Sequence, residues 1–105
     1  LSTGKGRFVN PGHMHESAWF CMKAGDILQD STITRRGVEL AKWANRIGKD
    51  KKYGGIISYA DALGETPEPI DWFKETNSLW NEKVWWPNAE ARMRLLIIIQ
   101  KKHIT

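Results

Sequence analysis

Hydrophobic and polar residues follow one another along the chain with spacings that predict helices separated by short turns. The first helix should begin at Asn10-Pro11, because Asn is a preferred helix cap and Pro suits the first helical position. We expect it to run to about Lys23 and to stop at Gly25. It is apolar over most of its circumference, which is typical of a helix buried among others; the large apolar residues are Met14, Trp19, Phe20 and Met22.

A second helix is predicted from about Ser31 to Ile47, with Asp30 or Ser31 as its cap and Gly48 past its end. Its apolar positions recur every three or four residues, which places them in one stripe. They are Ile33, Gly37, Leu40, Ala41, Ala44 and Ile47. Charged residues mostly occupy the opposite face, so one side of this helix should pack against a neighbour.

After the second helix the pattern changes. Residues 53–59, Tyr-Gly-Gly-Ile-Ile-Ser-Tyr, predict a short strand, because β-branched and aromatic residues are bounded there by glycine. Residues 60–64 predict a turn, and residues 65–67 a weak partner strand that its proline confines to a sheet edge. Residues 70–83 are interpreted as a loop that contains a helical turn near 71–74.

A last helix is predicted to begin at Pro87, again at a first helical position. Four of its residues should face inward: Ala89, Met93, Leu96 and Ile97. Glu90 and Arg94 are spaced to form an i,i+4 ion pair. Residues 1–9 and 100–105 are expected to be loosely ordered. The fold class is therefore mainly α, with about three helices and a short β-hairpin.

Length and charge narrow the classes of function. The chain has 105 residues and a formal net charge of +4, and it is long enough for a single domain. Its basic residues are scattered apart from two small clusters where helices should end, so we expect no nucleic-acid partner; the clusters are Lys49/Lys51/Lys52 and Lys101/Lys102. The longest apolar run, Leu95–Ile99, is far shorter than a membrane span, and no signal peptide is recognisable. The single cysteine fits a reducing compartment, and we expect a cytoplasmic location.

Six tryptophans are the unusual feature of the composition, and three of them, Trp80, Trp85 and Trp86, lie close together. Tryptophan fills protein cores, and it also stacks on the apolar face of a sugar ring. The composition alone leaves both uses open.

His13 is the candidate for chemistry, in the first turn of the helix that Pro11 opens. Glu16 follows three residues later and shares its face. A carboxylate there would orient the imidazole, and the helix N-terminus would favour the neutral base, which suits a proton-transfer group. Gly12 would let a ligand approach the backbone. The alternative is a histidine that only packs at a helix start. His15 points elsewhere and is interpreted as structural, and the two histidines diverge too much for a metal site.

Three segments resemble the N-acylglucosamine 2-epimerase family, which also includes renin-binding proteins. Residues 10–20, Asn-Pro-Gly-His-Met-His-Glu-Ser-Ala-Trp-Phe, are similar to the family's NPGH-x-x-E-x-x-W-F segment. Residues 83–91, Lys-Val-Trp-Trp-Pro-Asn-Ala-Glu-Ala, resemble its K-x-W-W-P-H-x-E-A segment. Tyr53-Gly54-Gly55, with Tyr59 and Asp61, is similar to the hairpin between them. The three occur in the family's order and together cover nearly the whole chain.

The resemblance implies part of an (α/α)6 barrel, with residues 1–105 as the C-terminal portion of a single domain. It implies interconversion of sugars that are epimeric at C2, in which a base removes the C2 proton of an open-chain N-acyl hexose and a second group returns one. His13 matches one of the family's two histidines, Glu16 matches its accompanying acid, and Asn88 stands where the second histidine is expected. Neutral Asn cannot exchange protons near pH 7. An aldose–ketose isomerase with one base, or a non-catalytic binding homologue, would tolerate this change.

Five further residues are predicted to bind the sugar: Arg7, Trp85, Trp86, Asn88 and Glu90. Each has a structural alternative: a surface position for Arg7, the barrel wall for the tryptophans, and pairing with Arg94 for Glu90. Tyr59 and Asp61 would line the mouth of the site, unless Asp61 only forms a turn. The expected partners are a small sugar and, in a full-length form, a second copy of the chain, with no cofactor.

Two consequences and one competing reaction complete these predictions. A three-helix portion of the barrel should expose apolar patches and show no turnover by itself. A glycoside hydrolase on the same barrel would need two carboxylates from Glu16, Glu90 and Asp61, and the Asn-Pro-Gly-His segment argues against it.

Overall fold

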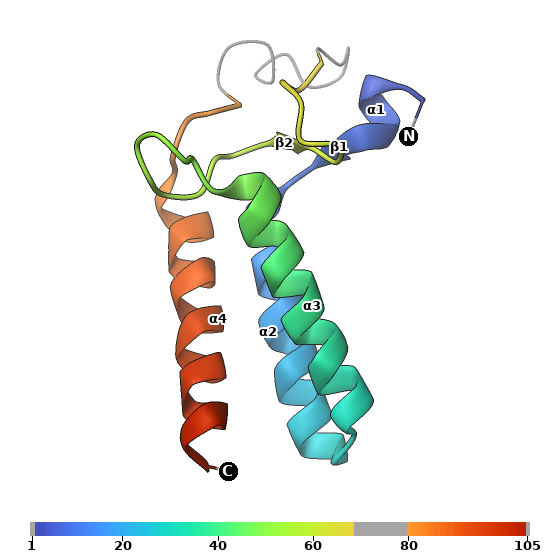
Figure 1. Cartoon of the computed structure of the whole chain (residues 1–105), viewed down its shortest axis with the longest axis vertical. Coiled ribbons are helices and arrows are strands. Elements are labelled where there is room, and N and C mark those ends of the chain that lie inside the picture. The colour runs from blue at the N-terminus through green and yellow to red at the C-terminus, as the bar shows by residue number, and fades with distance from the viewer. Residues whose placement is uncertain (1, 69–79, 105) are drawn as a thin grey trace.

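The computed structural model describes residues 2–68 and 80–104, and this part of the chain is mainly helical (Figure 1). The mainly α fold class is thereby confirmed. In chain order the elements are α1 Gly4–Arg7, β1 Phe8–Val9, α2 Pro11–Leu28, α3 Ser31–Gly48, β2 Ala60–Asp61 and α4 Trp85–Ile104. None of the helices in the described ranges is long and apolar enough to cross a membrane.

Helices α2 and α3 form a closely packed hairpin. The buried positions of α3 are small residues, and three of them, Gly37, Ala41 and Ala44, belong to the predicted stripe. The fourth, Gly48, was predicted to lie past the helix end but is the last residue of α3. A Cβ atom on Gly37 would lie 2.7 Å from the carbonyl oxygen of Ala18 in α2, so only glycine fits there. The two backbones approach closely because the residues between them are small, and the stripe predicted for α3 is confirmed.

Helix α2 is longer than predicted and does not stop at Gly25. It continues to Leu28, and Gln29 ends it in the left-handed conformation with φ 52°. Gly25 is buried, and a Cβ atom there would lie 2.1 Å from the hydroxyl oxygen of Thr34. This glycine therefore serves the contact with α3 rather than a helix end, and the residue pattern alone does not separate these two uses.

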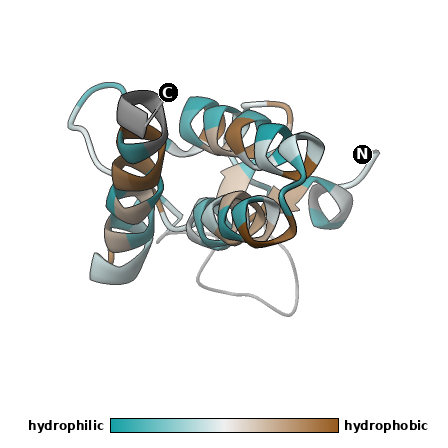
Figure 2. Cartoon of the chain, turned by 90° about the horizontal axis from the view of Figure 1, so that it is seen from below, coloured by the Kyte–Doolittle hydropathy of each residue, from teal (hydrophilic) through white to brown (hydrophobic). Residues whose placement is uncertain are grey.

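Helix α4 packs beside α2 and begins at Trp85, two residues before the predicted start. Pro87 still lies in the first turn, where its missing N–H needs no partner. Of the four residues predicted to face inward, only Ile97 is buried, at 4% exposed. Leu96 is 57% exposed and Met93 45%, and hydrophobic positions recur along α4 (Figure 2). The predicted exposed apolar surface is confirmed on this helix.

The small sheet was predicted with the wrong partners. Strand β2 pairs antiparallel with β1, with Phe8 opposite Asp61 and Val9 opposite Ala60, so neither 53–59 nor 65–67 is a strand of this sheet. Residues 4–9, expected to be loosely ordered, form α1 and β1, and α4 continues to Ile104. Local sequence patterns cannot reveal a pairing between residues more than fifty positions apart.

Residues 49–59 instead form a turn and an extended segment. Asp50 and Gly55 are joined by an N–H···O bond of 3.0 Å, and Gly54 and Gly55 take φ values of 77° and 80°. The backbone N–H groups of Ser58 and Tyr59 donate to carbonyl oxygens of the 80–82 segment at 3.0 Å. The helical turn predicted near 71–74 lies outside the described residues.

Candidate functional site

The start of α2 presents His13 to solvent. The side-chain oxygen of Asn10 caps the helix by accepting a hydrogen bond of 3.1 Å from the backbone N–H of His13. Pro11 occupies the first helical position and is fully buried. The predicted cap and helix start are confirmed, and they fix the backbone of His13 while its side chain stays exposed.

The starts of α2 and α4 meet at the same end of the helical layer, beside the small sheet (Figure 1). A Cβ atom on Gly12 would lie 2.6 Å from the indole of Trp86 and 2.8 Å from Cβ of Pro87. The imidazole of His13 lies against the same indole, with ring centroids 4.9 Å apart and planes inclined by 40°. Trp86 thus covers Gly12, and the prediction that a ligand could approach the backbone of Gly12 is wrong. His13 and Trp86, which are 73 positions apart in sequence, form one cluster.

Asn88 is held by backbone groups on both sides. Its side-chain oxygen accepts a 2.9 Å hydrogen bond from the N–H of Ile56, and its amide nitrogen donates at 2.9 Å to the carbonyl of Val84. Residue 88 therefore joins the loop after α3 to the start of α4. Its predicted contact with a sugar stays a prediction.

Glu90 faces α2 rather than Arg94. Its carboxylate accepts a short hydrogen bond from the indole N–H of Trp19. The ion pair expected between Glu90 and Arg94 is absent from the described contacts, and Nε of Arg94 is buried without a hydrogen-bond partner there. Burial lowers the pKa of this guanidinium from its usual value. The bond to Trp19 fixes the second family-like segment to the first.

Arg7 contacts carboxylates rather than the cluster of His13 and Trp86. The guanidinium of Arg7 binds Asp61 at 2.8 Å and Glu68 at 2.7 Å, and its side chain is only 12% exposed. Asp61 also accepts a 2.7 Å bond from the N–H of Leu63, so it does form a turn. Trp85 is 81% exposed. Arg7 is thus not a free surface cation. To bind a ligand, its guanidinium would first have to break its ion pairs with these carboxylates.

Glu16 is half-buried on α2, one turn after His13. Within the described ranges, the contacts of the His13 side chain and N–H are those with Trp86 and Asn10, and Glu16 is not among them. The pairing of His13 with Glu16 therefore stays a prediction.

His15 was interpreted as structural, and its surroundings are unusual. It is fully buried, and neither ring nitrogen has a hydrogen-bond partner in the part of the chain described. Burial first, and then the charge of Arg94, lowers the pKa of His15 from 6.5 to about 4. Sequence reasoning did not connect His15 with the buried stripe of α2, although the spacing of Pro11, His15, Ala18 and Met22 indicates it.

What this arrangement can do chemically depends on the exposed imidazole. His13 lies in the first turn of an 18-residue helix, and its side chain is exposed to solvent. The Trp86 indole supplies a flat apolar surface beside it, of the kind that packs on sugar rings. A solvent-accessible base against an aromatic face suits proton transfer on a small ligand.

Comparison with known proteins agrees with these motifs. Residues 3–102 match the family model described as N-acylglucosamine 2-epimerase (GlcNAc 2-epimerase). The chain is 31% identical over 96 residues to the N-acylglucosamine 2-epimerase of Mus musculus and 29% identical over 98 residues to that of Bos taurus. These matches cover 88% and 92% of this chain but only 20% and 21% of the relatives. The chain therefore spans about a fifth of the length of the curated relatives it matches.

Proposed function

Because the chain belongs to the N-acylglucosamine 2-epimerase family, we propose that it carries one side of a sugar 2-epimerase site, with His13 as the proton-transfer group. The substrate would be an open-chain N-acyl hexose, whose C2 proton is acidified by the neighbouring carbonyl. His13 would take this proton, leaving an enolate anion whose charge is shared between C2 and the C1 oxygen. Return of a proton to the opposite face of C2 would complete the inversion.

The observation that carries the proposal is the exposed imidazole of His13 lying 4.9 Å from the Trp86 ring. Exposure leaves the base open to a substrate. The indole would pack on the carbon face of the sugar and hold C2 beside the imidazole. Glu16, on the same helix, would accept hydrogen bonds from sugar hydroxyls or from the imidazolium formed during the reaction.

The second side of the reaction is assigned differently from the family pattern. Both polar atoms of the Asn88 side chain already bond to backbone groups, and an amide has no proton to exchange near pH 7. We therefore give Asn88 and Glu90 roles in holding the two segments together. The returning proton would come from another group. A one-base isomerisation is the second candidate function and requires an aldose with a hydroxyl group at C2. His13 would return the C2 proton to C1 while the proton of the C2 hydroxyl passes to O1, and the product would be a ketose.

A chimera tests the proposal, because the curated relatives are about five times longer than this chain. The matching segment of the mouse relative is replaced by this chain, and C2 deuterium uptake into N-acetylmannosamine is followed in D2O by NMR. Losing a positioned acid or base typically costs about 10²–10⁴-fold, so His13→Gln should slow exchange at least a hundredfold. Ser17→Ala, on an exposed position of the same helix, is the control and should have little effect.

The products separate the two candidates. Inversion of N-acetylmannosamine at C2 supports the epimerase, and a ketose formed from free mannose, which carries a hydroxyl at C2, supports the isomerase. An active chimera in which His13→Gln exchanges as fast as the parent would refute both. Asn88→His in the same chimera adds a further check: no gain in exchange is expected, since we assign residue 88 to holding the backbone rather than to exchanging protons.

A further inference from the structure

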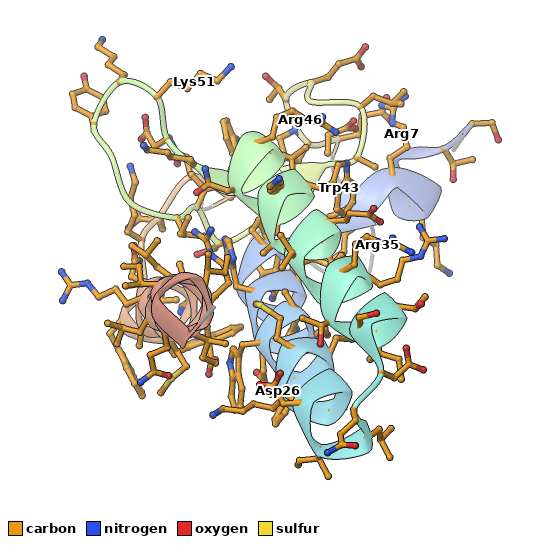
Figure 3. All side chains as sticks on the ribbon, turned by 60° about the horizontal axis from the view of Figure 1, so that its bottom comes forward. Arg7, Asp26, Arg35, Trp43, Arg46 and Lys51 are labelled. Carbon is orange, nitrogen blue, oxygen red and sulfur yellow. The ribbon has the colours of Figure 1, made fainter. Side chains whose placement is uncertain are left out.

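A cavity of about 870 Å³ lies at the C-terminal end of α3, away from the contacts of His13. The turn after α3, the turn at 62–64 and the segment at 80–83 line it. Its charged lining residues are Arg46, Lys49, Asp50, Lys51, Lys52 and Lys83. Figure 3 shows Arg46 in the last turn of α3 and Lys51 on the loop beyond, at the same end of the molecule.

The charge of this lining is strongly unbalanced. Five cations and one carboxylate give a formal charge of +4, which equals the net charge of the whole chain. The carboxylate, Asp50, is already occupied by the ammonium of Lys83 and by the N–H groups of Tyr53 and Lys52, and these contacts lower its pKa to about 2. Within the described residues, Arg46, Lys49 and Lys51 have no carboxylate partner.

The loop that carries the cations has a defined backbone. Its N–H and C=O groups close on each other, with the N–H of Gly54 donating to the carbonyl of Asp50 at 2.9 Å. The ammonium groups of Lys52 and Lys83 lie 5.0 and 5.8 Å from the centre of the Tyr53 ring. Two cations from separate segments are therefore gathered on one wall of the cavity.

Stabilisation of a helix end explains only part of this arrangement. Cations near a helix C-terminus are favourable, but the effect falls off within the last turn. The effect accounts for Arg46 and for Lys49, the residue that caps the C-terminal end of α3. Lys83 is held by its ion pair with Asp50. Lys51 and Lys52 follow in the loop beyond the helix end, so another reason is needed for their convergence on this cavity.

We propose that this cavity binds a small phosphate-bearing ligand. A phosphate group carries up to two negative charges, which several ammonium groups around one space can neutralise. The volume falls in the range of about 300–1,000 Å³ that is usual for small-molecule sites. Tyr53 and Trp80 in the lining offer flat surfaces for an organic part of the ligand. The concave shape favours a small molecule over nucleic acid. Nucleic acid would bind equally well to cations scattered over a surface and needs no cavity.

The test titrates the 105-residue chain with inorganic pyrophosphate at low ionic strength and follows binding by calorimetry. The cavity variant is Lys49→Gln with Lys52→Gln. The control is Lys23→Gln with Lys42→Gln, two exposed lysines outside the cavity, and it carries the same net charge as the cavity variant. We expect saturable binding, weakened at least tenfold in the cavity variant and less than twofold in the control.

A second arm identifies the source of the phosphate. A hexose 6-phosphate that binds more tightly than pyrophosphate, while the free hexose does not bind, indicates a sugar phosphate; tighter binding of pyrophosphate indicates a free phosphate compound. Three results would overturn the proposal. Binding could be weakened equally in both lysine variants, or no saturable binding could be found. A DNA duplex could also displace pyrophosphate in a way that depends equally on all four lysines. Circular dichroism checks folding, and Arg46→Gln with Lys51→Gln replaces the cavity variant if it unfolds.

Discussion

His15 offers a sharp test of the packing between α2 and α4. Its side chain is fully buried and both ring nitrogens lack partners among the described residues, while the guanidinium of Arg94 acts on it through its positive charge. A buried polar group without a hydrogen bond costs about 1–3 kcal/mol. Replacement by leucine, which is apolar and of similar size, should therefore raise the free energy of unfolding at pH 7.

The same residue should make stability depend on pH. The pKa of His15 is about 4 in the folded chain, against 6.5 for the free side chain. Between these values the unfolded ring binds a proton that the folded ring does not, so stability falls as the pH drops below 6.5. At about 1.4 kcal/mol per pKa unit, the contribution is on the order of 2 kcal/mol at pH 5 and about 3 kcal/mol by pH 4.

Urea denaturation followed by circular dichroism measures both effects, between pH 7.5 and pH 5. His15→Leu should be more stable at pH 7 and should lose about 2 kcal/mol of the pH dependence. His15→Gln is the matched control, because glutamine does not titrate but keeps buried polar atoms. His15→Gln should lose the pH dependence of stability, but its free energy of unfolding at pH 7 should not rise.

Two results would contradict this reasoning. If His15→Leu retained the parent's fall in stability toward pH 5, the titrating group would lie elsewhere. If the leucine variant were less stable than the glutamine variant at pH 7, the imidazole would have hydrogen-bond partners that the described contacts do not contain.

Four further substitutions, two of them combined in one cycle, test other contacts. Asn88→Ala removes two hydrogen bonds to the backbone and should lower the free energy of unfolding by about 1–3 kcal/mol in urea denaturation; an unchanged midpoint would mean that these bonds add nothing. Gly37→Ala places a Cβ atom 2.7 Å from the carbonyl of Ala18 and should cost about 1–3 kcal/mol, whereas a more stable variant would show that α2 and α3 can separate freely. Gly12→Ala should cost a similar amount through its clash with Trp86, and Trp86→Leu should remove most of that cost in a double-mutant cycle, which additive effects would disprove.

The helices could be predicted from the sequence because their signals are local. Asn10 and Asp30 cap their helices through the side-chain bonds that such residues usually make, and the small residues of α3 repeat at helical spacing. The errors occur where a residue has two possible uses. Gly25 looks like a helix end, yet its function is to admit Thr34, and no local pattern reports how closely another helix approaches.

The sheet and the site contacts depend on the remote partner, so the sequence alone could not predict them. Phe8 and Val9 form a strand only because Ala60 and Asp61 are brought opposite them. The i,i+4 spacing predicts an ion pair between Glu90 and Arg94 on α4. In the folded chain the carboxylate of Glu90 instead accepts a hydrogen bond from Trp19 of another helix. The motifs therefore name the candidate residues, but the contacts that these residues make could not be predicted from the sequence.

The position of His13 depends on glycines as much as on its own helix. Pro11 rests on Gly48, where a Cβ atom would lie 2.4 Å from the proline ring, and Gly12 rests under Trp86. The start of α2 is thus fixed between the end of α3 and the start of α4 by two positions that lack a side chain. Since His13 follows directly, its place beside the indole is set by three helices. The proposed base is therefore held by tertiary packing, while its ring remains exposed for a substrate.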